Sequence, residues 1–242
     1  MRVSFDTRHG TRTGILKTYD RREGSVSRVL PGSDEHVDYD SSYEGDLMAL
    51  VSEGEHVPVF DEVIYGYRDP ARMDLSTPAR QECFFQALRL EEFSNETMAY
   101  EALRHLQGDC VPGFYTSMTW TPDCKNGQAL MIGAVLIEEI EGAKTLQDFW
   151  DDIGDENYEE SLLFGYISRE EKRVQASVED AGVFDGDRHA GNTLIVLDNL
   201  QQGYIKLIQI DFGFARTGLA EDVLQLEREL EELEEELEDS LN

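Results

Sequence analysis

Residues 187–213 read DRHAGNTLIVLDNLQQGYIKLIQIDFG, and this stretch says most about the fold. Two apolar runs, TLIVL (193–197) and YIKLIQI (204–210), flank the segment 198–203 and predict two strands joined by a loop. Asp187 and Asn192 stand just before the first strand, and Asp211-Phe-Gly follows directly after the second. Carboxylate and amide oxygens therefore flank one hairpin, and these are oxygens that suit the hard cation Mg²⁺.

The N-terminal half shows a second set of periodic segments. Residues 2–5 and 14–19 (GILKTY) predict short strands joined by a turn around Gly10. From Pro78 to Gly108 apolar residues recur every three or four positions, which predicts a helix that ends at Gly108. A break near Glu92–Ser94 would divide it into two helices. Both interpretations place one long helical region in the middle of the chain.

Two further strands follow this helical region. FYTSMTWT (114–121) and QALMIGAVLIEEI (128–140) flank Asn126-Gly127, a dipeptide that favours a tight hairpin. The run ALMIGAVLI is apolar almost throughout, which indicates a central, buried strand. Residues 144–152 predict a short helix and residues 159–180 a longer one. The aromatic residues, Trp120 and Trp150 among them, are most simply explained as core.

The remaining segments are acidic. Residues 21–79 combine turn residues with scattered acids and are interpreted as an insertion, helical near Asp46–Ser52. Residues 221–242 have Leu and Val at alternating three- and four-residue spacing, and eleven acids against Arg228. Such a run repels an identical partner. It predicts an amphipathic helix whose Leu face packs on its own domain or on a different, basic protein.

Composition excludes several classes of function. The chain of 242 residues has 21 Lys and Arg against 51 Asp and Glu, so its formal net charge is −30. This charge repels nucleic acid and anionic membranes, so neither is expected as a partner. Three widely spaced cysteines, no signal-peptide core and no apolar run of about 18 residues predict a cytoplasmic or nuclear protein, not secreted and without a transmembrane segment.

The order of the motifs resembles the protein-kinase-like superfamily, which includes protein kinases and aminoglycoside phosphotransferases. There an H-x-D-x-x-x-x-N loop precedes a hairpin that ends in D-F-G. LKTYDRR (16–22) and residues 79–115 also resemble fungal protein-kinase-like proteins, whose helix carries E-x-x-A-Y-x-x-L-x-x-L-Q-G. That pattern runs here from Glu96 to Gly108, and Pro112 follows it. The resemblance covers residues 14–20 and 78–215.

The resemblance implies a role for each matching residue. Asp187 falls at the catalytic Asp, and Asn192 and Asp211 fall at the two positions that hold Mg²⁺ on the phosphates of ATP. Lys17 would bind the phosphates with Glu96 as its partner. The segment from Glu138 to Ile140 would form the hinge whose backbone N–H and C=O groups contact adenine.

The fold implied is α+β, a protein-kinase-like two-lobed fold. Residues 1–142 would form an N-lobe with a small antiparallel sheet and the insertion at about 21–79. Residues 143–220 would form a shortened, mainly helical C-lobe with the catalytic loop and D-F-G, and residues 221–242 a C-terminal acidic helix.

Four departures from the superfamily pattern count against a working enzyme. Asp185 stands where kinases have the catalytic-loop His, and we expect its side chain to point away. Only Gly10 and Gly14 precede Lys17, so there is no full glycine-rich loop. No A-P-E segment follows Gly213. The insertion of roughly 60 residues is long enough to cover the nucleotide cleft.

Each candidate residue also has a structural explanation. Lys17 would then be a strand-edge lysine with its ammonium group in water. Glu96 would be one more solvated helix charge, and Asn192 would cap the turn into the next strand. For His189 we favour a hydrogen bond within the loop over acid–base work.

Two functions follow from the sequence. The first is an ATP- and Mg²⁺-dependent phosphotransferase that transfers the γ-phosphate to a hydroxyl acceptor, a protein or a small molecule. The second is a catalytically impaired pseudokinase that acts as a protein-interaction module through its acidic insertion and tail.

Overall fold

The computed structural model describes residues 1–8, 10–20, 22, 28, 30, 37–52, 75–120, 131–153, 162–197 and 205–218. The chain divides into two compact units. Unit 1 comprises Met1–Thr97 and Tyr115–Glu139, and unit 2 comprises Met98–Phe114 and Ile140–Asn242. The sequence had assigned residues 98–114 to the N-terminal part, whereas here they group with the C-terminal one. Within each unit α-helices accompany small antiparallel sheets, so the chain has a mixed α and β structure.

Unit 1 is built on a four-stranded sheet in the order β1-β2-β4-β3. Its strands are β1 (Arg2–Thr7), β2 (Gly10–Tyr19), β3 (Phe114–Trp120) and β4 (Ile132–Glu138). β4 lies between two neighbours, and its six residues from Ile132 to Ile137 are buried, as the unbroken apolar run predicted. β2 and β4 are antiparallel, with Lys17 opposite Val135.

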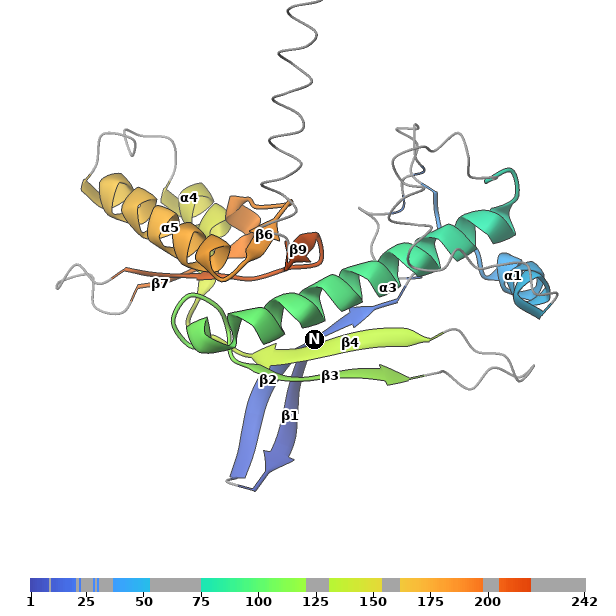
Figure 1. Ribbon diagram of the computed structural model, residues 1–242, viewed down its shortest axis with the longest axis horizontal. Helices are drawn as coiled ribbons and strands as arrows, with labels where there is room; N and C mark the ends of the chain where they lie inside the picture. The colour runs from blue at the N-terminus through green and yellow to red at the C-terminus, as the bar shows by residue number, and fades with distance from the viewer. Residues whose placement is uncertain are drawn as a thin grey trace, which may run out of the picture. The chain divides into compact units, whose positions relative to one another are not determined.

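A long helix, α3 (Pro78–Ala102), runs along this sheet in unit 1 (Figure 1). It begins at Pro78, since Pro is well suited to a first helical turn, and contains no Gly or further Pro. For this reason α3 is continuous through Glu92–Ser94, and the alternative of a break there is wrong. The 3₁₀ helix η4 (Leu103–Leu106) follows it, and Gly108 then takes a left-handed φ of 80°.

The insertion contributes a short helix to unit 1. The 3₁₀ helix η2 (Ser41–Tyr43) leads into α1 (Glu44–Ser52), close to the helical segment expected at Asp46–Ser52. Leu47 of α1 is fully buried against Ala79 and Cys83 of α3, with Leu50 packed beside them. This part of the insertion therefore packs against the N-terminal end of α3 (Figure 1).

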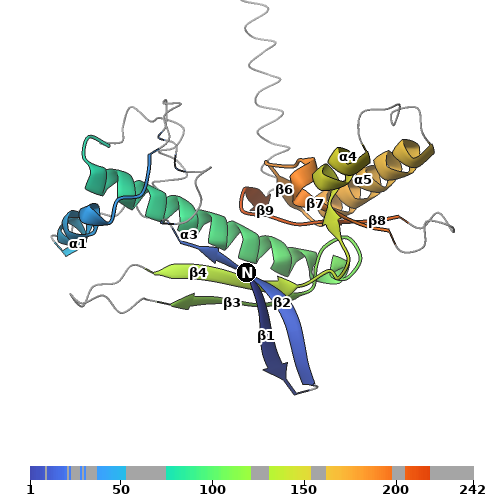
Figure 2. The same cartoon turned by 180° about the vertical axis from the view of Figure 1, so that it is seen from behind.

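The described residues of unit 2 after Ile140 form α-helices and small antiparallel sheets (Figure 2). α4 (Leu146–Ile153) follows β5 (Lys144–Thr145), and α5 (Leu162–Asp180) leads to β6 (Val183–Asp185). The 3₁₀ helix η6 (Ala190–Asn192) precedes the hairpin of β7 (Thr193–Val196) and β8 (Lys206–Gln209), and β9 (Ala215–Thr217) comes last. The sheets have the orders β5-β7-β8 and β6-β9.

Some sequence expectations need correction. Trp120 belongs to the edge strand β3, and 40% of it is exposed, so it is not a core residue. Phe214 is 55% exposed because it lies in the turn before β9. The predicted turn around Gly10 is confirmed, because Thr7 pairs directly with Gly10, where β2 begins with a φ of 117°. The acidic segment 221–242 and Asn126-Gly127 lie outside the described residues.

Within the described ranges, no helix has both the length and the apolar composition needed to cross a bilayer.

Candidate functional site

The polar centre of unit 1 is an ion pair between β2 and α3. Lys17 Nζ donates to Glu96 Oε2 at 2.6 Å, and the hydroxyl of Tyr19 donates to the same oxygen. The Glu96 side chain is fully buried, whereas 31% of the Lys17 side chain is exposed. Burial rules out the interpretation of Glu96 as a solvated helix charge. The carboxylate instead receives two donors from one strand.

The local sequence explains this arrangement. Lys17 and Tyr19 are two residues apart on a strand, so their side chains point to the same face of the sheet. Gly133 lies opposite Tyr19 in the antiparallel register, and a Cβ at Gly133 would clash with the ring of Phe93 on α3. The missing side chain therefore lets α3 approach the sheet closely. At this separation, Glu96 reaches the end of the Lys17 side chain.

In unit 2, the loop after β6 holds the predicted catalytic residue. Asp187 has a side chain that is 53% exposed, and His189 Nε2 lies 3.8 Å from its Oδ2. His189 Nδ1 accepts a hydrogen bond from the backbone N–H of Gly191 at 3.0 Å, so the neutral ring carries its proton on Nε2. This contact agrees with the structural role favoured for His189.

Asn192 ends this loop and is 91% buried, being 9% exposed. Its Nδ2 donates to the backbone oxygen of Asp187 at 2.9 Å, which directs Oδ1 away from that backbone. Its own backbone oxygen accepts from the N–H of Ile210 at 2.8 Å. Asn192 therefore ties the Asp187 loop to the end of β8, one residue before Asp211.

Asp211 adopts an uncommon backbone conformation. Its φ is 62°, a left-handed value, and it is the only non-glycine residue in the described ranges with a positive φ. Asp tolerates this region better than most residues. The N–H of Gly213 approaches Asp211 Oδ1 at 3.4 Å. Phe212 is fully buried and packs edge-on against Tyr100, with ring centroids 5.3 Å apart, so the D-F-G turn is anchored next to Asp211.

Asp185 does not point away, contrary to the sequence expectation. Its Oδ1 accepts from the backbone N–H of Asp187 at 3.1 Å, and its Oδ2 accepts from Gln209 Nε2 at 2.7 Å. Burial raises the pKa of Asp185, and the nearby charges of Asp187 and Asp211 raise it further, against the lowering effect of the two hydrogen bonds. Three carboxylates therefore influence one another at the mouth of the hairpin.

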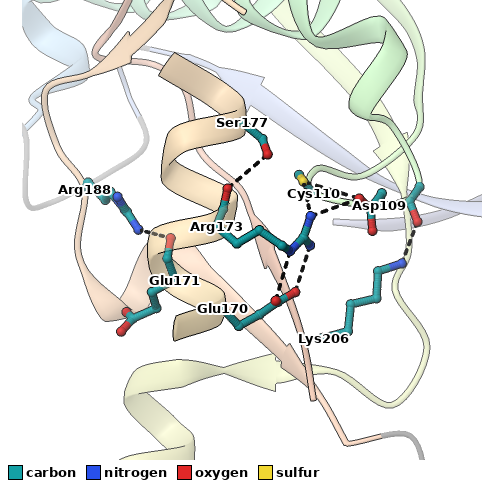
Figure 3. Close-up of polar contacts among 9 residues, drawn as sticks. Asp109, Cys110, Glu170, Glu171, Arg173, Ser177, Arg188 and Lys206 are labelled. Atoms are coloured by element: carbon teal, nitrogen blue, oxygen red, sulfur yellow. Dashed lines mark hydrogen bonds and ion pairs between the residues drawn. The ribbon is translucent and has the colours of Figure 1, made fainter. Parts of the chain in front are cut away.

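Two arginines fasten the surroundings of this loop in unit 2 (Figure 3). Arg188, next to Asp187, donates from Nη2 to the backbone oxygen of Glu171 on α5 at 3.0 Å. Arg173 bridges Glu170 at 2.8 Å and Asp109 at 3.2 Å, and it also contacts Cys110 Sγ. Burial raises the pKa of the Cys110 thiol, against the lowering effect of the Arg173 charge, so burial favours the protonated thiol.

The expected hinge falls at the division between the units. Glu138 is the last residue of β4, and the boundary lies between Glu139 and Ile140. Glu139 pairs with Arg2 of β1 at 2.9 Å. Ile140 accepts a hydrogen bond from the N–H of Ala143 at 3.3 Å, which closes a turn. Contacts of Glu138 or Ile140 with adenine stay a prediction.

The donor set of unit 2 fits Mg²⁺. In the described part of the chain, no group of three or more His, Cys, Asp and Glu side chains is arranged as a metal site. Mg²⁺, however, is commonly held by one or two protein oxygens together with phosphate oxygens and water. Asp211 offers a carboxylate and Asn192 an amide oxygen, and both flank the same hairpin. These two residues would hold the ion.

The sequence argument missed three supporting residues. Tyr19 had a visible signal, because it lies two positions after Lys17 on the same strand face. Gln209 was also visible as a polar residue in the apolar run YIKLIQI, and it is 98% buried with its amide on Asp185. Arg28, described below, had no local signal, since its partner Glu82 is 54 residues away.

Comparison with known proteins adds no family to these observations. Neither a protein-family model nor a curated protein matches the chain.

Proposed function

We propose that the chain is an ATP- and Mg²⁺-dependent phosphotransferase with a protein-kinase-like, two-lobed fold. It transfers the γ-phosphate to a hydroxyl group of a protein or of a small molecule. Unit 1 supplies the Lys17–Glu96 pair for the phosphates, and unit 2 supplies Asp187, Asn192 and Asp211.

The arrangement around Asn192 is the observation that supports this proposal most. A single asparagine holds the backbone of Asp187 through its side chain and the backbone of Ile210 through its carbonyl oxygen. The residue that would take the acceptor proton and the residue that would hold the metal are thereby kept in fixed register. A mere turn cap would need only one of these two contacts.

The order of the elements gives further support. A strand Lys paired with a buried helix Glu comes first, and a loop with Asp187 comes between β6 and a hairpin. D-F-G follows the hairpin, and β9 then pairs with β6, so that Asp185 lies opposite Ala215. This is the sequence of parts that phosphoryl transfer on such a scaffold uses.

The chemistry assigns a task to each side chain. Lys17 places its ammonium on the phosphate oxygens, and Glu96 fixes the position of that ammonium. Asp187, whose side chain is exposed, accepts the proton of the acceptor hydroxyl and orients its oxygen. Asn192 and Asp211 bind Mg²⁺, which neutralises the developing phosphate charge when bound. Asp185 holds the backbone of Asp187 in place.

Phosphate release from Mg·ATP tests the proposal without knowledge of the acceptor, because water serves as a slow substitute. We expect Asp187→Ala to lower the rate by about 10²-fold or more, since a positioned base contributes about that much. Asp180→Ala is the matched control, because Asp180 is an exposed acid at the end of α5. Equal rates for wild type and Asp187→Ala would refute the catalytic role.

A second function, a nucleotide-binding or nucleotide-free interaction module, is favoured by the β1–β2 hairpin. Gly10 and Gly14 are the only glycines of the sequence before Lys17, so this hairpin lacks the full glycine-rich pattern that covers the phosphates in protein kinases. Binding of Mg·ATP without phosphate release above the Asp187→Ala level would favour this alternative. The acidic insertion and the acidic tail would then be the parts that contact a basic protein.

A further inference from the structure

Arg28, from the insertion, has its side chain almost entirely inside unit 1. Only 3% of the side chain is exposed. Its Nη2 contacts Glu82 Oε1 on α3, and its Nη1 lies 3.3 Å from Glu82 Oε2, so that the guanidinium meets both carboxylate oxygens. Its Nε donates to the backbone oxygen of Val37 at 2.7 Å. The planar group also lies over the ring of Phe85, 4.3 Å from the centroid.

These contacts continue along the insertion. The N–H of Val37 returns a hydrogen bond to the backbone oxygen of Arg28 at 2.7 Å, so the two residues form a small backbone bridge. Sixteen positions after Arg28 the chain reaches α1, where Leu47 is buried against Ala79 and Cys83. We call Arg28, Val37 and Leu47 the α3 clamp.

The clamp explains an unusual stretch of α3. All six residues from Glu82 to Ala87 are buried, although one face of a helix on a sheet is normally exposed. Glu82 and Gln86 are polar, and each has a partner: Arg28 for Glu82, and the backbone oxygen of Met131 for Gln86 at 2.8 Å. The helix is therefore enclosed by the sheet and the clamp together.

The same helix carries Glu96. Glu82 and Glu96 are fourteen residues apart, which is about four helical turns or about 21 Å, so the two carboxylates point to nearly the same side. α3 has no internal Gly or Pro that would let it bend between them. A shift of the helix at Glu82 would therefore be carried to Glu96 and to its contact with Lys17.

We propose that the α3 clamp regulates the Lys17–Glu96 pair by holding α3 in the position where that pair forms, with Arg28 as the positioning residue. The link to nucleotide rests on the function proposed above. The part of the insertion that forms the α3 clamp then contributes to nucleotide binding. Its displacement frees α3 to move away from Lys17 and weakens the binding of Mg·ATP.

Cys83 offers a direct probe of the clamp, because Leu47 packs over it and only 6% of it is exposed. In a Cys110→Ala, Cys124→Ser background Cys83 is the single thiol of the chain. We expect Arg28→Ala to raise the rate of its reaction with N-ethylmaleimide by about tenfold or more, and to weaken Mg·ATP binding by about tenfold, the fold-change that 1.4 kcal/mol represents. Arg28→Lys keeps the charge without the planar fork and should give smaller changes of the same sign.

Arg22→Ala is the matched control, because Arg22 also pairs with an acid, Asp20, but has a side chain that is 41% exposed. It should change neither readout. A double-mutant cycle separates positioning from general destabilisation. If Arg28 acts through Lys17, then Arg28→Ala weakens Mg·ATP binding by no more than about twofold in a Lys17→Met background.

The outcomes are distinguishable. Faster Cys83 modification with unchanged Mg·ATP affinity refutes the regulation and leaves the proposed function intact, and an unchanged Cys83 rate refutes the clamp itself. If wild type binds no Mg·ATP, the proposed function fails. In that case amide hydrogen exchange around Glu96 tests whether the α3 clamp controls the Lys17–Glu96 pair. Faster exchange in Arg28→Ala than in wild type supports this control, and identical exchange overturns it.

Discussion

Two carboxylates at the two candidate centres have opposite electrostatic surroundings. Glu96 in unit 1 is fully buried, and its charge is balanced by Lys17 and by the hydroxyl of Tyr19. Asp185 in unit 2 is half-buried; burial raises its pKa most, and the negative charges of Asp187 and Asp211 raise it further. One centre contains its own cation, whereas the other concentrates negative charge.

This difference indicates how a chain with a net charge of −30 would bind negatively charged phosphate groups. At Glu96 the protein compensates the acid internally, so the pair is present before any ligand arrives. At Asp185 the mutual repulsion of three acids is relieved by any bound cation, because an opposite charge favours the ionised forms. Phosphate is therefore expected to bind as the metal complex.

Replacing Lys17 should have the largest effect on stability. Lys17→Met leaves the buried carboxylate of Glu96 without its cation, and we expect the free energy of unfolding to fall by about 3 kcal/mol at pH 7. Without that cation, burial of the carboxyl group favours its protonated form. The difference in the free energy of unfolding between Lys17→Met and wild type should become smaller as the pH is lowered towards about 4, the unperturbed pKa of a Glu side chain.

Urea unfolding of both proteins across this pH range measures that deficit. Lys144→Met is the control, because Lys144 and Asp152 form a 2.7 Å ion pair with both side chains largely exposed. Surface pairs contribute about 0–1 kcal/mol. A deficit for Lys17→Met no larger than that of the control, or one that does not depend on pH, would contradict the picture of a buried, compensated Glu96.

Replacing the acid of the same pair should cost less. In Glu96→Gln the amide oxygen still accepts from Tyr19, and the partly exposed Lys17 ammonium keeps its access to water. We expect a loss of about 1.5–2 kcal/mol, in the lower part of the range of about 1.5–3 kcal/mol for a hydrogen bond to a charged group, because Lys17 is partly exposed. Denaturant titration measures this loss of stability, and Glu101→Gln on the exposed side of α3 is the control. A loss larger than that of Lys17→Met would reverse the proposed asymmetry.

Two substitutions of Asp211 separate the effect of its backbone conformation on stability from the effect of its charge. Asp211→Ala should lower the free energy of unfolding by about 1–2 kcal/mol relative to Asp211→Asn, because φ at this position is 62° and Ala adopts left-handed conformations poorly. Asn tolerates the conformation and removes only the charge. Calorimetric or chemical unfolding of the pair gives the difference. Equal stabilities would show that the left-handed turn is not formed in solution.

The smallest effect is expected at Asp185 and is seen in its pH dependence. A raised folded-state pKa means that Asp185 contributes stability below about pH 3.8, its unfolded value, and that this contribution is lost as pH rises through the folded pKa. In Asp185→Asn that loss is absent. Between acid and neutral pH, wild type should therefore lose stability that Asp185→Asn keeps, so the variant becomes more stable relative to wild type as the pH rises. Thermal unfolding at a series of pH values measures this difference.

Added Mg²⁺ should reduce the stability advantage of Asp185→Asn at neutral pH, because a cation near Asp211 offsets the repulsion between carboxylates that the variant relieves. A pH-independent difference between the two proteins would mean that the pKa of Asp185 is not raised in the folded state.

The sequence predicted the elements better than their contacts. The hairpin of β7 and β8, the buried strand β4 and the long helix α3 all carry local periodicity, which survives in any tertiary context. Lys17 and Glu96 are 79 residues apart, and their pairing was reached only through a resemblance to a family. Periodicity alone does not place them side by side.

Other features depend on contacts that no local pattern encodes. Asp185 was expected to point away because like charges repel, yet the N–H of Asp187 and the amide of Gln209 outweigh that repulsion. Arg28 lies in the segment interpreted as an acidic insertion, and its burial depends on a carboxylate 54 residues along the chain. Trp120 was assigned to the core by residue type, although its strand lies at the edge of the sheet.

Mg²⁺-dependent binding of ATP tests the central claim most directly. Thermal unfolding is followed with ATP alone, with Mg²⁺ alone and with both, for wild type and for Asp211→Asn. We predict that only the combination stabilises wild type, by about 2.7 kcal/mol at a free concentration one hundred times Kd, and that Asp211→Asn loses this gain. Stabilisation of both proteins alike, or of neither, would contradict the account.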